Sequence, residues 1–278
     1  MGIAKTFFVA ATFAVAASSV IAGTSKFTDL PGNPDLKSAS AIVLDESGNL
    51  IYGKDVDTAR PIASITKLMT AMVVLDSGIG LDEKVTITKE DRDLVRLTGS
   101  RLEYGATLSR REMILLALMS SENRAATALG RTYPGGMENF LAHMNRKARA
   151  LGMTNSHFAD PAGLKKENVS TAADLAKMVT AAEEYALITE ATTTRRKDVY
   201  PYKGRGNLTY GNTNRLLKNA SWDIELSKTG YINEAGRCLV MQANIEGEDV
   251  SIVLLNSFGK LTPYGDSNRL RKWMLANS

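Results

Sequence analysis

The chain has 278 residues, 44% of them hydrophobic and 23% charged, so it can bury a substantial core and does not have the composition of a disordered protein. The formal net charge of +4 is a mild excess without aromatic-interleaved basic blocks, which argues against nucleic-acid binding and suits acidic partners. A single cysteine, Cys238, excludes an internal disulfide.

The first residues have the three-part layout of a secretory signal. Lys5 is followed by an apolar run over residues 7–17 and by small residues ending at Ala22. We therefore expect residues 1–22 to be a signal peptide cleaved after Ala22. The alternative is a retained membrane anchor, which needs about 20 apolar residues, and here Thr12 and two serines interrupt a shorter run. The sequence alone leaves cleavage or retention open.

The next segments predict a lead-in, a hairpin and a helix. Residues 23–37 are rich in Pro, Gly, Asp and Ser and predict an irregular lead-in, with the folded body starting near Ser38. Residues 38–55 carry apolar strands on both sides of a DESGN turn and predict a β-hairpin. From Ile62 the apolar residues recur at helical spacing until Gly78.

The middle of the chain is predicted to be helical. Ser109 to Glu112 reads SRRE, a capping box ahead of an apolar run, because the serine can accept from the third helical N–H while the glutamate reaches back. Further helices are expected over residues 137–151, closed by Gly152, and over residues 171–185. We expect these helices to form a lobe at about residues 81–190.

The last third returns to strands, over residues 221–230, 237–247 and 250–259, before a basic helix at 266–278. Cys238 falls in one of these apolar strands and is predicted to be buried, not a nucleophile. Strands at both ends of the chain predict an α/β fold. One antiparallel sheet is built from the N- and C-terminal segments and flanked by helices, and the helical lobe comes from the middle of the chain.

Ser64 and Lys67 stand three residues apart at the start of the predicted helix. A Ser-x-x-Lys match is weak evidence alone, since Ser257 to Lys260 also matches, although at a strand end. Ser64 differs because residues i and i+3 share a helix face. To act as a base near pH 7, Lys67 needs its pKa lowered from about 10.4 by ~3 units, by burial and by a second cation.

Two further motifs could complete such a site. Lys228-Thr229-Gly230 ends a predicted strand, where the threonine and lysine can bind a carboxylate and the glycine leaves the backbone open to an extended peptide. Ser121-Glu122-Asn123 follows the capped helix and offers a hydroxyl to relay a proton and an amide to hold a peptide carbonyl. A second Ser-x-Asn, at residues 47–49, lies in the predicted hairpin turn.

Ser-x-x-Lys, Ser-x-Asn and Lys-Thr-Gly in this order resemble the signature of penicillin-recognising serine enzymes. With the stretches ASITKLMTAMVVLD, RREMILLALMSSENRAA, GNTNRLL and SKTGYINEAGRCLVM, the chain from about Ser38 onward is similar to the low-molecular-mass penicillin-binding proteins. Within them it most resembles the D-alanyl-D-alanine endopeptidase branch, the penicillin-binding protein 7 type. The resemblance implies a β-lactamase/transpeptidase-like fold and a D,D-peptidase domain over residues 38–278.

The resemblance also implies a role for each motif residue, without a metal or cofactor. Ser64 would be the acylated nucleophile, Lys67 its base and Ser121 the proton relay toward the leaving amine. Substrate binding would fall to Asn123, Lys228, Thr229, Gly230 and Tyr231, and the N–H groups of Ser64 and Tyr231 would form an oxyanion hole. The arginine that helps bind the carboxylate in carboxypeptidases has no match here, and Lys260 is the candidate substitute.

The implied reaction is hydrolysis of D-alanyl bonds in peptidoglycan peptides through an acyl-enzyme, with cross-links as the expected target. The location would be the periplasm, with β-lactams as covalent inhibitors. Three rival functions stay open: a D,D-carboxypeptidase, which shares every motif, a β-lactamase, for which the sequence lacks an ExxLN loop, and a non-catalytic wall-binding module. A Ser-His-Asp hydrolase or zinc peptidase is disfavoured, since His143 and His157 are the only histidines and neither Gly-x-Ser-x-Gly nor HExxH occurs.

Overall fold

The structure is a computed structural model that describes residues 25–278. The predicted signal peptide at residues 1–22 lies outside the described residues. Within the described part of the chain, no helix combines the length and the apolar character needed to cross a membrane.

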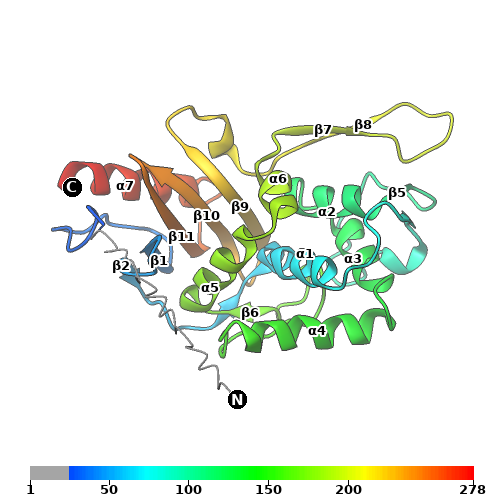
Figure 1. The fold of residues 1–278 in the computed structure, drawn as a ribbon, viewed down its shortest axis with the longest axis horizontal. Helices are drawn as coiled ribbons and strands as arrows, with labels where there is room; N and C mark the ends of the chain where they lie inside the picture. Colours follow the sequence, from blue (N-terminus) through cyan, green and yellow to red (C-terminus); the bar gives the residue numbers. More distant parts are fainter. Residues whose placement is uncertain (1–24) are drawn as a thin grey trace, which may run out of the picture.

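A five-stranded antiparallel sheet forms one half of the molecule, with the strand order β2-β1-β11-β10-β9 (Figure 1). Its strands are β1 (Ser40–Asp45), β2 (Leu50–Lys54), β9 (Asp223–Ile232), β10 (Gly236–Ile245) and β11 (Glu248–Ser257). The N-terminal strand β1 pairs directly with β11, with Ser40 opposite Leu255. The predicted single sheet from both ends of the chain is therefore confirmed.

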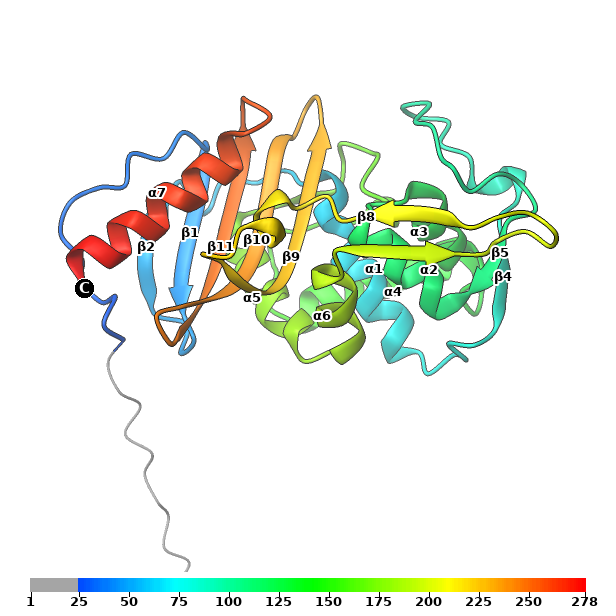
Figure 2. The same cartoon turned by 90° about the horizontal axis from the view of Figure 1, so that it is seen from above.

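The two faces of this sheet are buried in different cores. Val240 and Val253 belong to the larger core with the helices of the middle of the chain, whereas their neighbours Met241 and Ile252 belong to a smaller core beneath α7 (Thr262–Asn277). This alternation follows from the two-residue period of a strand. Helix α5 (Ala172–Glu183) covers the first face and α7 crosses the second (Figure 2).

The other half of the molecule is helical, and α1 packs against the other helices within it (Figure 1). Its helices are α1 (Thr66–Asp76), α2 (Arg110–Met119), α3 (Asn123–Arg131), α4 (Gly136–Ala150) and α6 (Ala186–Thr193). The predicted capping box is confirmed, because the Ser109 and Glu112 side chains each accept from the other's backbone N–H. Strand β9, at the sheet edge, faces this lobe (Figure 2).

Several short elements were not predicted from the sequence. Helices α3 and α6 are separate from their neighbours, and a β7–β8 hairpin (Arg196–Val199 and Leu208–Gly211) extends along the helical lobe (Figure 2). Two more short pairs join β3 (Arg60–Pro61) to β6 (Val169–Ser170) and β4 (Lys84–Thr86) to β5 (Thr107–Ser109). Helix α7 begins earlier than predicted, at Thr262, with Pro263 in its first turn, where proline is tolerated.

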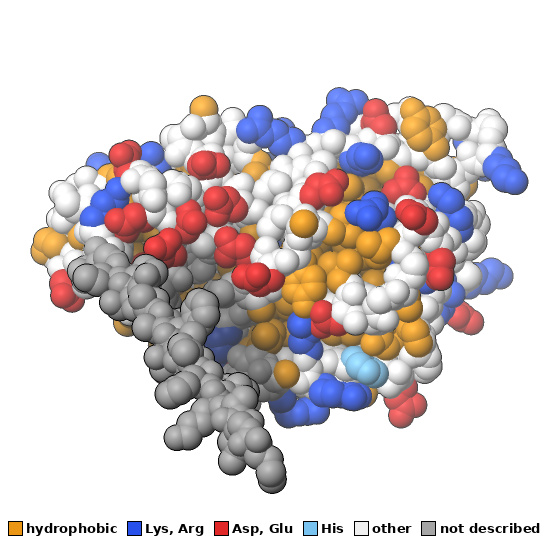
Figure 3. Space-filling model, in the orientation of Figure 1, with side chains coloured by type: hydrophobic (Ala, Val, Ile, Leu, Met, Phe, Trp, Pro, Cys, Tyr) orange, Lys and Arg blue, Asp and Glu red, His pale blue; other side chains and the backbone are white. Residues whose placement is uncertain are grey.

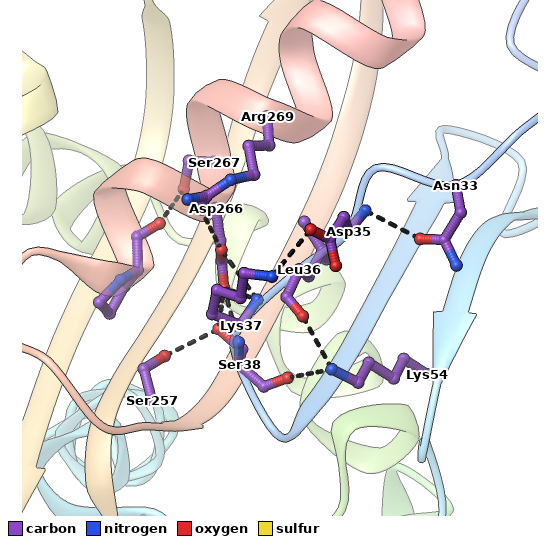
Figure 4. Close-up of polar contacts among 11 residues, drawn as sticks. Asn33, Asp35, Leu36, Lys37, Ser38, Lys54, Ser257, Asp266, Ser267 and Arg269 are labelled. Carbon is purple, nitrogen blue, oxygen red and sulfur yellow. Dashed lines mark hydrogen bonds and ion pairs between the residues drawn. The ribbon is translucent and has the colours of Figure 1, made fainter.

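A buried carboxylate fastens the segment before β1 to α7 (Figure 4). Asp266 is fully buried and accepts hydrogen bonds from the Ser38 backbone N–H at 2.7 Å, the Ser38 hydroxyl at 2.6 Å and the Lys37 N–H at 3.1 Å. The Ser257 hydroxyl, at the end of β11, lies 2.7 Å from that of Ser38. The chain before β1, the end of β11 and the first turns of α7 thus share one hydrogen-bond network.

Replacing this carboxylate should destabilise the whole domain. Asp266→Ala leaves buried N–H and hydroxyl donors without an acceptor, so we expect the free energy of unfolding to fall by about 3 kcal/mol. Urea denaturation measures the change. Glu103→Ala is the control, because it removes an ion pair to Arg205 in which both side chains are largely exposed, and we expect a change within about 0.5 kcal/mol. Equal effects of the two substitutions would contradict this account of Asp266.

Candidate active site

Ser64 lies where the chain enters α1. It sits in a short 3-10 helix, η1 (Ala63–Ile65), and its Oγ is 2.8 Å from Nζ of Lys67 in the first turn of α1. The residue before it, Ala63, has a φ of +49°, in the left-handed region that non-glycine residues seldom adopt. Such strain is tolerated where the surrounding structure holds the backbone in place.

Two glycines allow that surrounding structure to pack directly on the backbone of η1. A Cβ atom at Gly163 would lie 1.9 Å from the carbonyl oxygen of Ala63, and one at Gly230 would lie 2.8 Å from that of Ile62. Gly163 belongs to the loop before β6, and Gly230 belongs to the Lys-Thr-Gly motif on β9. Both positions therefore require glycine for a steric reason, and Gly230 brings β9 against the backbone N–H of Ser64.

The Lys67 ammonium group is fully buried and has three hydrogen-bond acceptors. Its Nζ donates to Ser64 Oγ at 2.8 Å, to Asn123 Oδ1 at 2.8 Å and to the Ala162 carbonyl at 2.6 Å. Burial lowers the pKa of Lys67 to about 7, although the carboxylates of Asp160, Glu122 and Asp93 act in the opposite direction. Lys67 can therefore exchange a proton near neutral pH.

The Ser-x-Asn motif reaches this group from the helical lobe. Ser121 connects α2 to α3 with a left-handed φ of +60°, and Asn123 is the first residue of α3. The Asn123 side chain accepts from Lys67 and donates to the Thr98 hydroxyl at 2.9 Å. This pairing fixes the orientation of the amide.

The Lys-Thr-Gly motif reaches the site from the sheet. Lys228 is buried and its Nζ donates to Ser121 Oγ at 3.0 Å and to the Thr229 carbonyl at 2.9 Å. Burial lowers the pKa of Lys228 well below its usual value, and the charge of Lys67 lowers it further. Three segments far apart in the sequence thus meet through the hydrogen bonds of two buried lysines, with Ser64 bonded to one and Ser121 to the other.

These residues border a cleft of about 390 Å³. Six predicted site residues line it, namely Ser64, Ser121, Asn123, Thr229, Gly230 and Tyr231, while the two lysines lie buried behind its wall. Cys238 also borders the cleft, but it is buried on β10 as predicted, and burial raises the pKa of its thiol to about 11. Neither histidine lines the cleft.

Other contributors were not predicted. The loop at residues 160–165 supplies the Ala162 carbonyl to Lys67, and the Asp160 carboxylate shapes this loop by accepting from the backbone N–H groups of residues 162–165. Thr213 contacts the Thr229 hydroxyl at 2.6 Å, and Arg215 and Arg237 line the cleft. Lys260, which was expected as a substitute for the carboxypeptidase arginine, lines the cleft as well. The stretch GNTNRLL, which contains Thr213 and Arg215, contributed to the resemblance without assigning either residue a role.

Comparisons with known proteins agree with this geometry. The family model described as D-alanyl-D-alanine carboxypeptidase, peptidase S11, matches residues 28–259. The chain is 48% identical over 246 residues to a D-alanyl-D-alanine endopeptidase of Pseudomonas aeruginosa, covering 88% of this chain and 79% of that protein. It is 45% identical over 242 residues to one of Escherichia coli, covering 87% and 78%.

A solved structure of a related enzyme has the same fold. The crystal structure of the Streptomyces K15 DD-transpeptidase superposes with a TM-score of 0.82 at 29% identity, covering 88% of this chain and all of that one. The fold is thus the expected transpeptidase-like fold. The chain belongs to the peptidase S11 family, that of the D-alanyl-D-alanine carboxypeptidases.

Proposed function

We propose that this protein is a serine D,D-peptidase that hydrolyses D-alanyl peptide bonds of peptidoglycan, with cross-links as its main target. The observation that carries the proposal is the short contact between Ser64 and a buried lysine whose pKa is about 7. The endopeptidase assignment is supported by relatives at 48% and 45% identity that are named endopeptidases. A carboxypeptidase is the second candidate, because a relative at 32% identity in Bacillus subtilis has that name.

In the proposed first step, Lys67 acts as the base. A neutral amine has two N–H donors and one lone pair, so Lys67 can donate to Asn123 and Ala162 while its lone pair faces the hydroxyl of Ser64. The proton passes from Oγ to Nζ as Oγ bonds to the carbonyl carbon of the D-alanyl residue. The N–H groups of Ser64 and Tyr231 are assigned to the oxyanion, where fixed donors lower the barrier.

The remaining steps use the other two motifs. The proton reaches the leaving amine through the Ser121 hydroxyl as the C–N bond breaks, and water then attacks the ester with the proton transfers reversed. Lys228 supports this relay through its hydrogen bond to Ser121, and we assign the substrate carboxylate to Thr229 and the peptide carbonyl to Asn123. A β-lactam would follow the same first step and remain on Ser64, because its leaving group stays attached.

We also propose that residues 1–22 direct export to the periplasm and that residues 38–278 work as one peptidase domain with the helical lobe inserted at about 81–190. The charge at Lys5, the apolar run and the small residues ending at Ala22 support export. Edman sequencing of the protein recovered from the periplasm should start at Gly23, and an N-terminus at Met1 would refute cleavage.

The choice between endopeptidase and carboxypeptidase is tested with purified cross-linked peptide dimers. We expect the products to be monomers, detected by chromatography and mass spectrometry. Intact dimers that lose only a terminal D-alanine would refute the endopeptidase assignment and favour the carboxypeptidase. A fluorescent penicillin distinguishes a peptidase from a β-lactamase and from a non-catalytic module, because a β-lactamase turns the drug over rapidly and a non-catalytic module forms no adduct.

A further inference from the structure

One wall of the cleft carries three cations without acidic partners. They are Arg215 on the 3-10 helix η3 (Arg215–Lys218), Arg237 at the start of β10 and Lys260 in the connection from β11 to α7. No Asp or Glu among residues 25–278 lines the cleft, and none of the three cations forms an ion pair with a described residue. By contrast, acidic and basic side chains are interspersed on the face in Figure 3.

Arg237 is held against the substrate-binding strand. It pairs with Tyr231 across β10 and β9, and its guanidinium carbon lies 3.6 Å from the centroid of the Tyr231 ring. Stacking uses the plane of the guanidinium and leaves its N–H groups free to bind a carboxylate. Because alternate residues of a strand share a face, Thr229 points to the same side of the sheet as Tyr231 and Arg237. Arg237 therefore lies on the same side of the sheet as Thr229 and on the opposite side from Lys228.

Contacts of Tyr264 place Arg215 near Arg237 and Thr229. Its hydroxyl donates to the Thr213 carbonyl at 3.2 Å, and it lines the cleft with the three cations. Burial raises the pKa of Tyr264, and the charges of Arg215 and Arg237 both act to lower it. Both guanidinium groups thus influence one phenol, which sits beside the Thr213–Thr229 contact. Figure 2 shows η3 and the start of α7 on this same face of the sheet.

We propose that Arg215, Arg237 and Lys260 form a second anionic subsite, for a carboxylate of the leaving group other than the one bound by Thr229. Lys260 is thus assigned to this second carboxylate and not to the one that the family resemblance suggested for it. The proposal rests on the proposed function. A released D-alanine has a single carboxylate, which Thr229 takes. The leaving group of a cross-link is a peptide whose amine belongs to a diamino acid, and it carries further carboxylates. Only a cross-linked substrate can use both subsites, so this wall selects for the endopeptidase reaction.

The test compares two substrates in one pair of variants. Arg215→Gln/Arg237→Gln removes two cations from the wall, and Lys218→Gln/Lys272→Gln makes the same charge change at exposed positions that do not line the cleft. For each protein, kcat/KM is measured on an acidic cross-linked peptide dimer and on a monomeric pentapeptide ending in D-Ala-D-Ala. Labelling of Ser64 by penicillin verifies that the active site is folded.

We expect the dimer-to-pentapeptide ratio of kcat/KM to fall about tenfold or more in the arginine variant and to stay at the wild-type value in the lysine control. An unchanged ratio in the arginine variant, or an equal fall of the ratio in the lysine control, would refute the proposed subsite. If the arginine variant fails to label, Lys260→Gln is measured in its place under the same criterion. If wild-type protein labels with penicillin but cleaves neither substrate, the proposed function fails instead.

Discussion

Ser64→Ala is expected to abolish peptide hydrolysis and to prevent covalent labelling by penicillin. Its hydroxyl is the group that Lys67 can deprotonate at 2.8 Å, and loss of a catalytic serine typically lowers kcat on the order of 10⁶-fold. The measurement is the rate of dimer cleavage, together with mass spectrometry of peptides from penicillin-treated protein. The wild-type adduct should lie on the peptide that contains Ser64.

Ser257→Ala is the matched control, because Ser257 begins the second Ser-x-x-Lys match in the sequence. Its hydroxyl contacts Ser38 in the Asp266 network, so the substitution should cost about 1 kcal/mol of stability and leave labelling intact. An adduct on any residue other than Ser64, or substantial hydrolysis by Ser64→Ala, would mean that the nucleophile has been assigned wrongly.

Lys67→Arg should slow acylation of Ser64 severely, although it preserves the positive charge. A guanidinium does not deprotonate at physiological pH, so it cannot accept the Ser64 proton. Loss of a general base costs about 10²–10⁴-fold, and the buried site has little room for the larger side chain. We expect the second-order rate constant for penicillin acylation to fall by about that factor, measured on protein whose thermal unfolding shows a cooperative transition. An active Lys67→Arg protein would place the base elsewhere.

The three motifs were predictable because each has a local signature. Ser-x-x-Lys needs a helix start, Ser-x-Asn follows a capped helix and Lys-Thr-Gly lies on a strand, and the structure has all three settings, although β9 continues past Gly230 to Ile232. Residue spacing along the sequence gave no distances between the motifs, so their meeting in one cleft was an expectation from the family resemblance. The hydrogen bonds of Lys67 and Lys228 supply the geometry.

The remaining parts of the site depend on packing that leaves little trace in the sequence. The Ala162 carbonyl contributes through its backbone, so its side chain carries no signal, and Asp160 looks like any loop aspartate until its hydrogen bonds are seen. Arg237 reaches the cleft because β10 pairs with β9 in one register. The expected lowering of the Lys67 pKa by a second cation is not found. Burial alone lowers the pKa of Lys67, and it is the pKa of Lys228 that the charge of the other lysine lowers.

The fold was predictable where the hydrophobic pattern was strong. Strand β1 and the three C-terminal strands have buried positions that the sequence marks with apolar residues. The β7–β8 hairpin was missed because three of the four residues of β7 are exposed and its sequence, Arg-Lys-Asp-Val, has no apolar alternation. Helix α3 was missed because its nine residues are too few to establish a helical period.

The pH dependence of acylation tests the central claim most directly, namely that a lysine at the active site loses its proton near neutrality. With the pKa of Lys67 lowered to about 7, the amine is protonated and inactive as a base below that pH and neutral above it. The rate constant for penicillin acylation should rise about tenfold per pH unit well below pH 7 and level off above about pH 8. A rate that stays flat or falls between about pH 5 and 8 would contradict the assignment of Lys67 as the base.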